Sequence, residues 1–400
     1  MIERGKSFLR RAFHQYWPSA IDRPKISRHE HYNEREEQEL LNHKHTDALE
    51  DIDPTPPSSS YDGILYNSIL GPNLDKLPSQ EEAMQLFQLW KKEHGRVYRD
   101  LEEMAKKFEI FVSNVKNIIE SNAKRSSPSS YLLGLNQFAD WSPYELQETY
   151  LHNIPMPENI SAMDLNDSPC SAPPSVDWRP IAVTAVKNQK DCGSCWAFSA
   201  TGAIEGASAL ATGKLISVSE QELLDCAYSF GCGGGWIDKA LDWVIGNRGI
   251  ASEIDYPYTA RKGTCRASTI RNSVSIDGYC PIAQSDNAFM CATAKYPIGF
   301  YFNVVNDFFQ YKSGIYDGPN CPVSSTFINH AMLIVGYGSI DGVGFWIVKN
   351  SWDTTWGMCG YALIKRDTSK PYGVCGIHAW PAYAATKCIG SVNPSIISSI

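Results

Sequence analysis

The stretch that decides the fold and the chemistry of this chain covers residues 187–199 and reads KNQKDCGSCWAFS. Gly193 and Ser194 allow a tight turn into a helix, which leaves Cys195 in the first helical turn. The unpaired backbone N–H groups at a helix start carry partial positive charge, and this charge favours a thiolate over a thiol. The stretch therefore predicts a nucleophilic cysteine at position 195.

Three further polar residues fit a catalytic role with this cysteine. His330 begins an apolar stretch, so a strand can hold its ring, and an imidazolium there would further favour the thiolate. Asn350 can orient the other ring nitrogen, and Trp352 can cover that contact from water. The side-chain N–H of Gln189 and the backbone N–H of Cys195 can stabilise the oxyanion of a tetrahedral intermediate. We predict Cys195, His330, Asn350 and Gln189 as the catalytic residues.

Other interpretations of these motifs are weaker. A Cys-x-x-Cys pair occurs in redox sites and zinc sites, but the chain has no second pair. The glycine cluster at 231–235 is not a phosphate loop, because no Lys-Ser/Thr follows it and the dinucleotide spacing fails. His378 is interpreted as a structural histidine. The sequence therefore predicts no metal site and no cofactor.

Composition excludes several classes of protein. The 400 residues are 43% hydrophobic and 20% charged, which is typical of a globular chain. The net charge of −8 arises ahead of Ala172, and the remainder is balanced, so there is no basic footprint for nucleic acid. No apolar run approaches the roughly 18–20 residues that a membrane span needs. We expect neither nucleic acid nor a membrane as a partner.

The 12 cysteines divide the chain in two. None occurs in the first 169 residues, Cys170 comes next, and the others follow from Cys192 onward. A cysteine-rich back half indicates a domain whose disulfides form on the secretory route. The start of the chain shows no apolar signal-peptide core, so no signal peptide is visible in the chain as given.

The front half divides into an extension and a helical section. Residues 1–78 are rich in Glu, His, Pro and Ser and are interpreted as a poorly structured extension, with a metal-binding tract as the less favoured alternative. Residues 79–154 carry two helical patterns, the first capped by Ser79 and the second from about 101 to 123. A strand or extended segment is expected at 134–140.

The back half follows a proline-rich linker at 155–171, where a protease would cut. Asn159 and Asn166 lie in glycosylation sequons of this linker. The main domain is expected at 172–385, with a tail at 386–400. It opens with a helical stretch and ends in strands, which favours an α+β fold. A short strand is predicted at 183–186, a helix from Cys195 to about Leu210, and strands at 298–305, 331–337, 345–348 and 361–364.

From about Ser79 to Tyr383 the chain resembles the papain family of cysteine proteases, particularly its plant vacuolar and secreted members. The front half is similar to that family's inhibitory propeptide, in an interlocking helical motif and in a second motif after it. The residues are Glu103, Lys107, Phe111, Asn114, Ile118 and Asn122, then Gly134, Asn136, Phe138 and Asp140. The resemblance implies a papain-like two-lobed domain, a helical lobe plus an antiparallel β-barrel-like lobe, preceded by a helical inhibitory propeptide. Maturation would fall near 170–174.

The resemblance also implies the lining of the substrate site. The matching positions are Gly234, Gly235, Trp236, Tyr301, Ile328, Asn329, Trp352 and Trp380. Because Trp236, Tyr301 and Trp380 are bulky, we expect a shallow specificity pocket that restricts cleavage to small or unusual side chains. Two departures from the family stand nearby. Asp353 replaces the usual Gly after the Asn-Ser-Trp triplet, and Met358 with Cys359 replaces an acidic and polar pair.

Three disulfides are implied by the same resemblance, namely Cys192–Cys232, Cys226–Cys265 and Cys321–Cys375. With Cys195 set aside, five cysteines are left without an assigned partner: Cys170, Cys280, Cys291, Cys359 and Cys388. A Cys280–Cys291 bond is one option that the family pattern does not support. Because five is odd, we expect at least one free thiol or an intermolecular bond.

The function that these predictions favour is an endopeptidase made as an inactive zymogen, acting through a Cys-His ion pair and an acyl-enzyme. Its pH optimum should be mildly acidic. The alternatives are a protease-fold storage or binding protein with weak or no turnover and, more remotely, a thiol–disulfide oxidoreductase. We expect protein or peptide substrates, the chain's own propeptide as intramolecular inhibitor, cystatin-type inhibitors and a monomer. By resemblance, the protein is vacuolar, lysosomal or extracellular.

Overall fold

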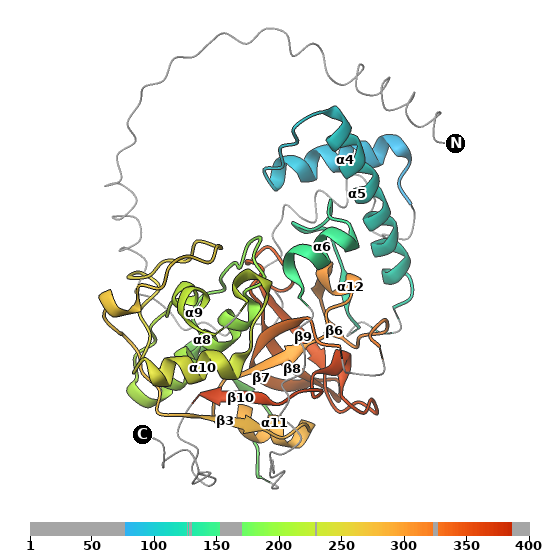
Figure 1. The fold of residues 1–400 in the computed structure, drawn as a ribbon. Coiled ribbons are helices and arrows are strands. Elements are labelled where there is room, and N and C mark those ends of the chain that lie inside the picture. The colour runs from blue at the N-terminus through green and yellow to red at the C-terminus, as the bar shows by residue number, and fades with distance from the viewer. Residues whose placement is uncertain are drawn as a thin grey trace, which may run out of the picture. The chain divides into compact units, whose positions relative to one another are not determined.

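The computed structural model describes residues 77–125, 127, 130–152, 170–228, 230–322 and 327–385 (Figure 1). The expectations for the N-terminal extension, for the sequons of Asn159 and Asn166 and for the C-terminal tail concern residues outside these ranges. Of the described helices, none is long and apolar enough to cross a membrane.

The N-terminal helical section, residues 77–152, contains α4 (Gln80–Glu93), α5 (Leu101–Asn122) and α6 (Pro143–Tyr150). The predicted cap of α4 is present, since Ser79 Oγ accepts from the Glu82 N–H at 3.3 Å and Glu82 Oε2 accepts from the Ser79 N–H at 2.7 Å. On the buried face, Phe87 and Trp90 contact the ring of Phe111 at centroid distances of 5.2 and 5.3 Å. Both helical patterns predicted from the sequence are confirmed.

The strand or extended segment expected at 134–140 is only partly correct. The strand β1 (Leu132–Leu133) is shorter and earlier, and it pairs antiparallel with β5 (Tyr311–Ser313). Beyond it, Asn136 Oδ1 accepts from the N–H of Phe138 at 2.9 Å, which turns the chain. The Asn136 side chain thus accepts the Phe138 N–H, which a longer strand would have donated to a neighbouring strand.

Helices dominate the early part of the back half. α8 (Cys195–Thr212) is apolar on nearly every face and buried along most of its length, which is the pattern of a central helix. It packs against α9 (Glu220–Cys226), α10 (Ile237–Gly246) and the strand β7 (His330–Ile340) (Figure 1). The other helical elements are α7 (Arg179–Ala182), η2 (Gly231–Gly233), η3 (Ala267–Thr269), α11 (Asp286–Thr293), α12 (Asn306–Phe309) and η4 (Val374–Gly376).

Strands dominate the late part and form a sheet in the order β3-β10-β4-β7-β8-β9-β6, with β2 paired to β7. Among the described strands, β6 and β9 pair parallel and the other pairs are antiparallel. The bounds are β2 (Val176–Asp177), β3 (Tyr279–Ile282), β4 (Ile298–Phe302), β6 (Ile315–Tyr316), β8 (Val343–Lys349), β9 (Tyr361–Lys365) and β10 (Ala382–Ala385). The four late runs predicted as strands coincide with β4, β7, β8 and β9. The α+β prediction is confirmed.

The short strand predicted at 183–186 is wrong. The structure has no regular element there, and the nearest pairing is a single bridge between Asn188 and Trp352. Val186 packs against Gly360, a residue with φ +88°, where an added Cβ would clash with the valine side chain. Thr184 Oγ1, in the same segment, donates to Glu205 Oε2 at 2.6 Å. Side-chain contacts therefore hold this segment in place of a ladder of backbone hydrogen bonds.

Four disulfides join described residues: Cys170–Cys291, Cys192–Cys232, Cys226–Cys265 and Cys321–Cys375. The last three are the pairs that the resemblance implied. The Cys280–Cys291 option is wrong, because Cys291 is bonded to Cys170. Among the described cysteines, Cys195 is free and buried and Cys359 is free and exposed.

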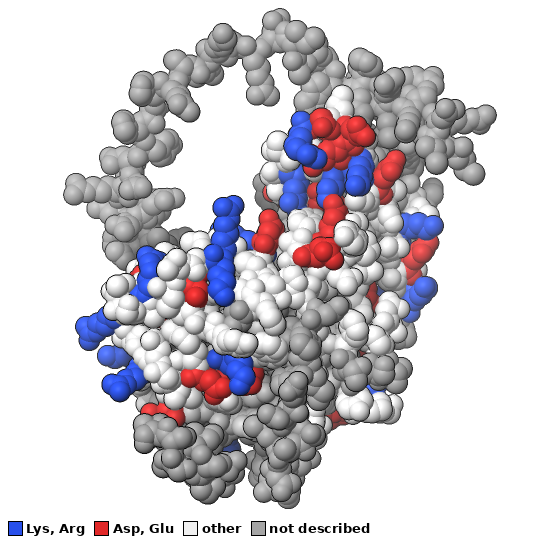
Figure 2. Space-filling view, viewed as in Figure 1, with Lys and Arg blue, Asp and Glu red and all other residues white. Residues whose placement is uncertain are grey.

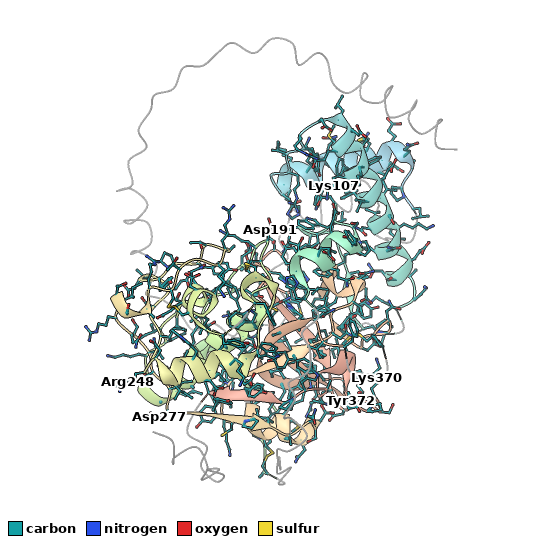
Figure 3. The ribbon with its side chains drawn as sticks, in the orientation of Figure 1. Lys107, Asp191, Arg248, Asp277, Lys370 and Tyr372 are labelled. Atoms are coloured by element: carbon teal, nitrogen blue, oxygen red, sulfur yellow. A yellow bond between two sulfur atoms is a disulfide. The ribbon has the colours of Figure 1, made fainter. Side chains whose placement is uncertain are left out.

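The charged surface of the N-terminal helical section carries both signs. On the face shown in Figure 2, Lys and Arg side chains are interspersed with Asp and Glu over the helices of this section. One such pair is partly buried, since Lys107 Nζ lies 2.9 Å from Glu145 Oε1 (Figure 3 labels Lys107). At least this ion pair therefore contributes to the internal packing of the section and not only to its surface.

Candidate active site

Cys195 is the first residue of α8, and only 3% of its surface is exposed. Its N-cap residue, Ser194, makes no side-chain cap, so N–H groups of the first turn stay available to the sulfur. Burial raises the pKa of the Cys195 thiol to about 11, while the backbone N–H groups of Ala331, Trp196 and Cys195 itself lower it. In the state described, burial therefore favours the thiol form of Cys195.

His330 is the first residue of β7 and is fully buried. Its Nε2 lies 3.0 Å from Asn350 Oδ1, and the Trp352 ring covers it at a centroid distance of 4.8 Å. Burial lowers the pKa of His330 to about 4, while the bond to Asn350 raises it. Its Nδ1 is buried and has no hydrogen-bond partner among the described residues. The adjacent residue, Ala331, presents its N–H to the Cys195 sulfur, so the two side chains come to one place.

In this proenzyme state, burial shifts the pKa values of both members of the predicted Cys-His pair toward their neutral forms. The prediction considered the helix start and the imidazole, which favour charge, but it did not include desolvation, which disfavours charge on both groups. The thiol pKa of about 11 and the imidazole pKa of about 4 both reflect this burial. Desolvation therefore opposes the charged pair while the site is covered.

His152, in the N-terminal helical section, contacts residues on both sides of Cys195 and His330. Its N–H donates to Asn329 O at 3.2 Å, next to His330, and its ring donates to the Cys232 carbonyl. The ring also lies against Gly193, where an added Cβ would clash with it. On the same section, Tyr150 OH donates to Asp191 Oδ1 at 3.4 Å (Figure 3 labels Asp191). The chain at His152 thus lies across the space between Gly193 and Asn329.

Gln189 is fully buried and held at both ends of its amide. Its Oε1 accepts from Ser351 Oγ at 2.6 Å, and its Nε2 donates to Cys192 O at 2.9 Å. Its backbone N–H donates to Ser351 O at 2.9 Å. These bonds fix which end of the amide is the donor and leave the second N–H of Nε2 for an oxyanion.

Bulky rings fill the region expected to be the specificity pocket. Tyr301, Ile328 and Trp380 are each 1% exposed, and the Tyr301 and Trp380 rings lie 4.9 Å apart. Tyr301 OH accepts from the N–H of Ile237 at 2.7 Å, which fixes the ring in place. Trp236 is less buried and contacts Phe230 at 5.4 Å.

The other expected substrate-binding residues lie on the two sides of the site. Gly234 has φ +112°, and Gly235 lies against the Trp196 indole, where an added Cβ would come within 2.6 Å. Asn329 Oδ1 accepts from the Val304 N–H at 2.8 Å, so its side chain holds β7 to the chain after β4. Trp352 stacks on Phe309 at 4.5 Å.

The two departures from the family pattern occupy left-handed backbone. Asp353 has φ +67° and Cys359 has φ +53°, a conformation that glycine adopts at lower cost. Asp353 Oδ2 accepts from Asn188 Nδ2 at 3.1 Å, and its Oδ1 accepts from the Thr354 N–H at 2.6 Å. A short side chain that bonds to its neighbours thus compensates for the missing glycine at 353.

Sequence reasoning missed the residues that support the site. Ser351 was quoted within the Asn-Ser-Trp triplet but received no role, and Tyr258 was not singled out. A buried ionic cluster of Lys187, Glu205 and Glu220 also lies behind Asn350, around a shared internal cavity. No sequence pattern marks these residues, because their partners are distant along the chain.

The structure also bears on metal and redox chemistry. Among the described residues, no group of three or more His, Cys, Asp or Glu side chains is placed to hold a metal ion. Cys192 is bonded to Cys232, which leaves Cys195 without the second thiol that a Cys-x-x-Cys redox pair needs. The oxidoreductase alternative is therefore contradicted.

Two family models match the chain. The model described as papain family cysteine protease matches residues 172–385, and that of the cathepsin propeptide inhibitor domain (I29) matches residues 87–146. The P34 probable thiol protease of Glycine max is 46% identical over 345 residues, covering 82% of this chain and 90% of that protein. A recombinant stem bromelain precursor is similar in structure, with TM-score 0.68, 40% identity and coverage of 76% and 98%. The proform of the ragweed pollen cysteine protease Amb a 11 has TM-score 0.68, 35% identity and coverage of 78% and 96%.

Proposed function

This chain belongs to the papain family of cysteine proteases, and we propose that Cys195, His330, Asn350 and Gln189 carry its peptidase chemistry. The protein is a cysteine peptidase in zymogen form, whose own propeptide is its intramolecular inhibitor and whose substrates are proteins or peptides. One observation carries the assignment of residues. The Ala331 N–H lies near the Cys195 sulfur, and Ala331 directly follows His330, whose Nδ1 has no hydrogen-bond partner among the described residues.

The chemistry begins when the propeptide leaves. Water then reaches the site, so the pKa of the thiol falls and that of the imidazole rises, and the Cys195 proton passes to His330 Nδ1. The thiolate adds to the scissile carbonyl carbon, and the oxyanion accepts from Gln189 Nε2 and the Cys195 N–H. The imidazolium protonates the leaving amine, which breaks the C–N bond and leaves a thioester. A water that His330 deprotonates hydrolyses the thioester, and the thiol is restored.

The storage-protein alternative lacks support. It required a family member with weak or no turnover, whereas all four proposed catalytic residues are present here, with His330 bonded to Asn350 and Gln189 bonded to Ser351. The curated relative reported above and both solved neighbours are named as proteases or as a protease precursor.

We also propose the division of the chain made from its sequence: an extension at 1–78, the propeptide at 79–154, a linker at 155–171, the peptidase domain at 172–385 and a tail at 386–400. The two family matches support the propeptide and peptidase ranges. The hydrogen bond from Tyr337 OH to Pro173 O, at 2.9 Å, supports a peptidase domain that begins near this proline. A cut ahead of Cys170 would leave the new N-terminus attached to α11 by the Cys170–Cys291 bond.

The pocket rings support a restricted substrate preference. Tyr301 and Trp380 fill the space beside Ile328, and Tyr301 is further fixed by its bond from the Ile237 N–H. We propose that substrates present small side chains to this pocket, since a bulky one would have to displace a buried ring. A peptide library cleaved by the matured enzyme tests this preference, and ordinary efficiency on bulky apolar residues would contradict it.

The disulfides support an oxidising destination, which we propose to be vacuolar, lysosomal or extracellular. Glycans on Asn159 and Asn166 would then lie in the linker. We propose that the enzyme acts as a monomer, and that cystatin-type inhibitors bind where His152 now lies.

The catalytic assignment is tested by titrating the matured enzyme with an epoxide that alkylates thiols and mapping the label by mass spectrometry. We expect label on Cys195 and loss of activity in a one-to-one ratio, because this thiol alone faces His330. A Cys359→Ser variant is the matched control, since Cys359 is free and exposed, and it should label and cleave normally. Activity that survives complete labelling of Cys195 would overturn the assignment.

A further inference from the structure

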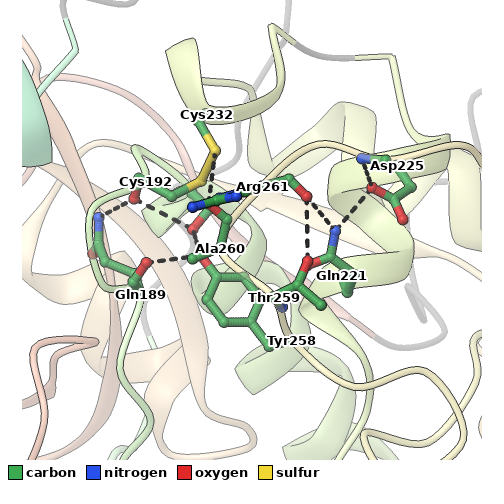
Figure 4. Close-up of a disulfide and its surroundings, with 11 residues drawn as sticks. Gln189, Cys192, Gln221, Asp225, Cys232, Tyr258, Thr259, Ala260 and Arg261 are labelled. Carbon is green, nitrogen blue, oxygen red and sulfur yellow. Dashed lines mark hydrogen bonds between the residues drawn. A yellow bond between two sulfur atoms is a disulfide. The ribbon is translucent and has the colours of Figure 1, made fainter.

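Tyr258 lies beside the oxyanion site without reaching the nucleophile itself. Its hydroxyl donates to Gln189 O at 2.8 Å (Figure 4). The same hydroxyl oxygen lies 2.5 Å from Ser194 Oγ. Its ring packs edge-on against Phe198 in the first turn of α8, at 5.0 Å. One side chain thus contacts the residue that supplies the side-chain oxyanion donor and the residue immediately before Cys195.

The direction of these hydrogen bonds follows from counting protons. Gln189 O is a carbonyl and can only accept, so the single Tyr258 proton goes to it. Ser194 Oγ must then donate to the Tyr258 oxygen, because Tyr258 has no second proton to give. The other acceptor near Ser194 Oγ is Cys192 O at 3.5 Å, which is a much weaker partner. The two hydrogen bonds therefore run in one direction, with Ser194 donating to Tyr258 and Tyr258 donating to Gln189.

The surroundings of Tyr258 keep its hydroxyl, and so this series of hydrogen bonds, in one protonation state. Burial raises the pKa of Tyr258, and the neighbouring carboxylates of Glu220 and Glu253 and the Cys195 sulfur act in the same direction, against the bond from Ser194. The hydroxyl therefore stays protonated at working pH. The Tyr258 backbone N–H donates to Glu253 Oε1 at 2.9 Å, which anchors the residue from its other side.

The backbone around Tyr258 is itself fixed from α9. Gln221 Oε1 accepts from the Thr259 N–H at 2.8 Å, and Gln221 Nε2 donates to Arg261 O at 2.7 Å and to Asp225 Oδ1 at 2.8 Å (Figure 4). The hydroxyl of Tyr258 is therefore held by a rigid support and does not move freely with Gln189.

We propose that Tyr258 is a positioning residue that sets the spacing between the two oxyanion donors, the Gln189 side-chain N–H and the Cys195 backbone N–H. The donors come from different segments, the loop at Gln189 and the start of α8. Ser351 orients the Gln189 amide, but it forms no hydrogen bond to α8 among the described residues, whereas the Ser194–Tyr258–Gln189 series of hydrogen bonds joins the two segments directly. Oxyanion stabilisation depends steeply on donor placement, so loosening this link should weaken the transition state more than substrate binding. The inference rests on the proposed oxyanion role of Gln189.

The test compares matured wild-type enzyme with Tyr258→Phe, which keeps the ring against Phe198 and removes only the hydroxyl. We expect kcat on a peptide amide to fall about tenfold with KM within about twofold. Affinity for a peptide aldehyde, whose thiohemiacetal oxygen occupies the oxyanion site, should fall by a similar factor. Alkylation of Cys195 by iodoacetamide, which forms no oxyanion, should change less than about twofold. Tyr372→Phe, at a half-exposed tyrosine, is the matched control and should change none of these.

Two further variants separate the ways in which the idea can fail. Ser194→Ala breaks the same chain at its other end, and it should give a similar loss that does not add to that of Tyr258→Phe. It also serves as the test if Tyr258→Phe does not fold. Gln189→Ala tests the underlying oxyanion role, and unchanged aldehyde affinity there would overturn the proposed function. Loss in Gln189→Ala with normal kcat and aldehyde affinity in Tyr258→Phe would overturn the role of Tyr258 alone. Equal losses in alkylation, KM and thermal stability would indicate a merely structural tyrosine.

Discussion

Two groups of ionisable side chains lie close together inside this protein. Their surroundings favour the charged forms in one group and the neutral forms in the other. In the first, Lys187 Nζ lies 2.7 Å from Glu220 and 3.2 Å from Glu205, and both carboxylate residues are 1% exposed. Burial lowers the pKa of Lys187, but these two carboxylates outweigh it and raise the pKa above its usual value. In the second, Cys195 and His330 are 3% and 0% exposed, against 18% for the Lys187 side chain, and their pKa values are shifted toward the neutral forms.

This difference indicates that ion-pair and hydrogen-bond partners, more than the extent of burial, decide which of these groups are charged. Lys187 also donates to Val218 O at 2.9 Å, so each of its bonds is satisfied inside the protein. His330 Nδ1 has no hydrogen-bond partner among the described residues, and the Cys195 sulfur lies near the backbone N–H groups of Ala331 and Trp196. The ionic cluster is permanent framework, whereas the catalytic pair must wait for solvent before it can become charged.

The largest expected effect comes from breaking the permanent cluster. Lys187→Met, made in a full-length proenzyme that also carries Cys195→Ser, should lower the free energy of unfolding by about 3–5 kcal/mol, because two carboxylates lose their counter-ion. Urea denaturation measures the change. Lys239→Met is the control, since Lys239 pairs with Asp242 at 3.4 Å on the exposed surface, and it should cost less than about 1 kcal/mol. Equal losses in the free energy of unfolding for the two variants would show that the buried cluster stabilises the fold no more than an exposed ion pair does.

A smaller effect should follow from removing the one side-chain bond that favours a charged His330. Asn350→Ala should reduce kcat of the matured enzyme by about 100-fold, because the ring loses its orientation. Asn350 raises the pKa of His330, so the variant imidazolium should lose its proton at lower pH. The alkaline limb of the kcat/KM profile should therefore move to lower pH. An unchanged alkaline limb would contradict the assigned role.

The smallest effect is expected at the half-buried pair of the propeptide. Lys107→Met should lower the free energy of unfolding of the proenzyme by at most about 1 kcal/mol, because both partners are partly solvated. Burial raises the pKa of Glu145, but bonds from Ser142 and Lys107 outweigh it and hold that pKa below its usual value. This stabilisation is present above the unfolded pKa of a glutamate and is lost as the pH falls through the lower folded value. Denaturation midpoints at several pH values measure it, with the exposed Lys116→Met as control.

The sequence predicted those parts of the molecule whose signal is local. The Ser79 cap, the start of α8 at Cys195 and the strand at His330 each depend on neighbours a few residues away, and the structure has all three. The segment at 183–186 was predicted wrongly, because an apolar run gives no information on whether a partner strand lies beside it. Distant supports such as Tyr258 for Gln189 left no local pattern to find.

The charge state of the catalytic pair was missed for a related reason. A helix start and an imidazole can be read from neighbouring residues, but desolvation depends on what covers them. His152 lies far from Cys195 in the sequence, yet its ring lies against Gly193 and donates to the Cys232 carbonyl. The local signals therefore led to the proposed site residues, but they carried no information on the desolvation that shifts the pKa values of Cys195 and His330 toward the neutral forms.

The central claim is that Cys195 is a neutral thiol beneath the propeptide and becomes a thiolate when the propeptide leaves. The most direct measurement is the rate of Cys195 alkylation by iodoacetamide as a function of pH, in proenzyme and matured enzyme that both carry Cys359→Ser. The proenzyme should react slowly, with a rate that rises only at alkaline pH, toward the raised thiol pKa of about 11. The matured enzyme should react at mildly acidic pH, at least about 100-fold faster than the proenzyme. Superimposable pH profiles for the two forms would contradict the account.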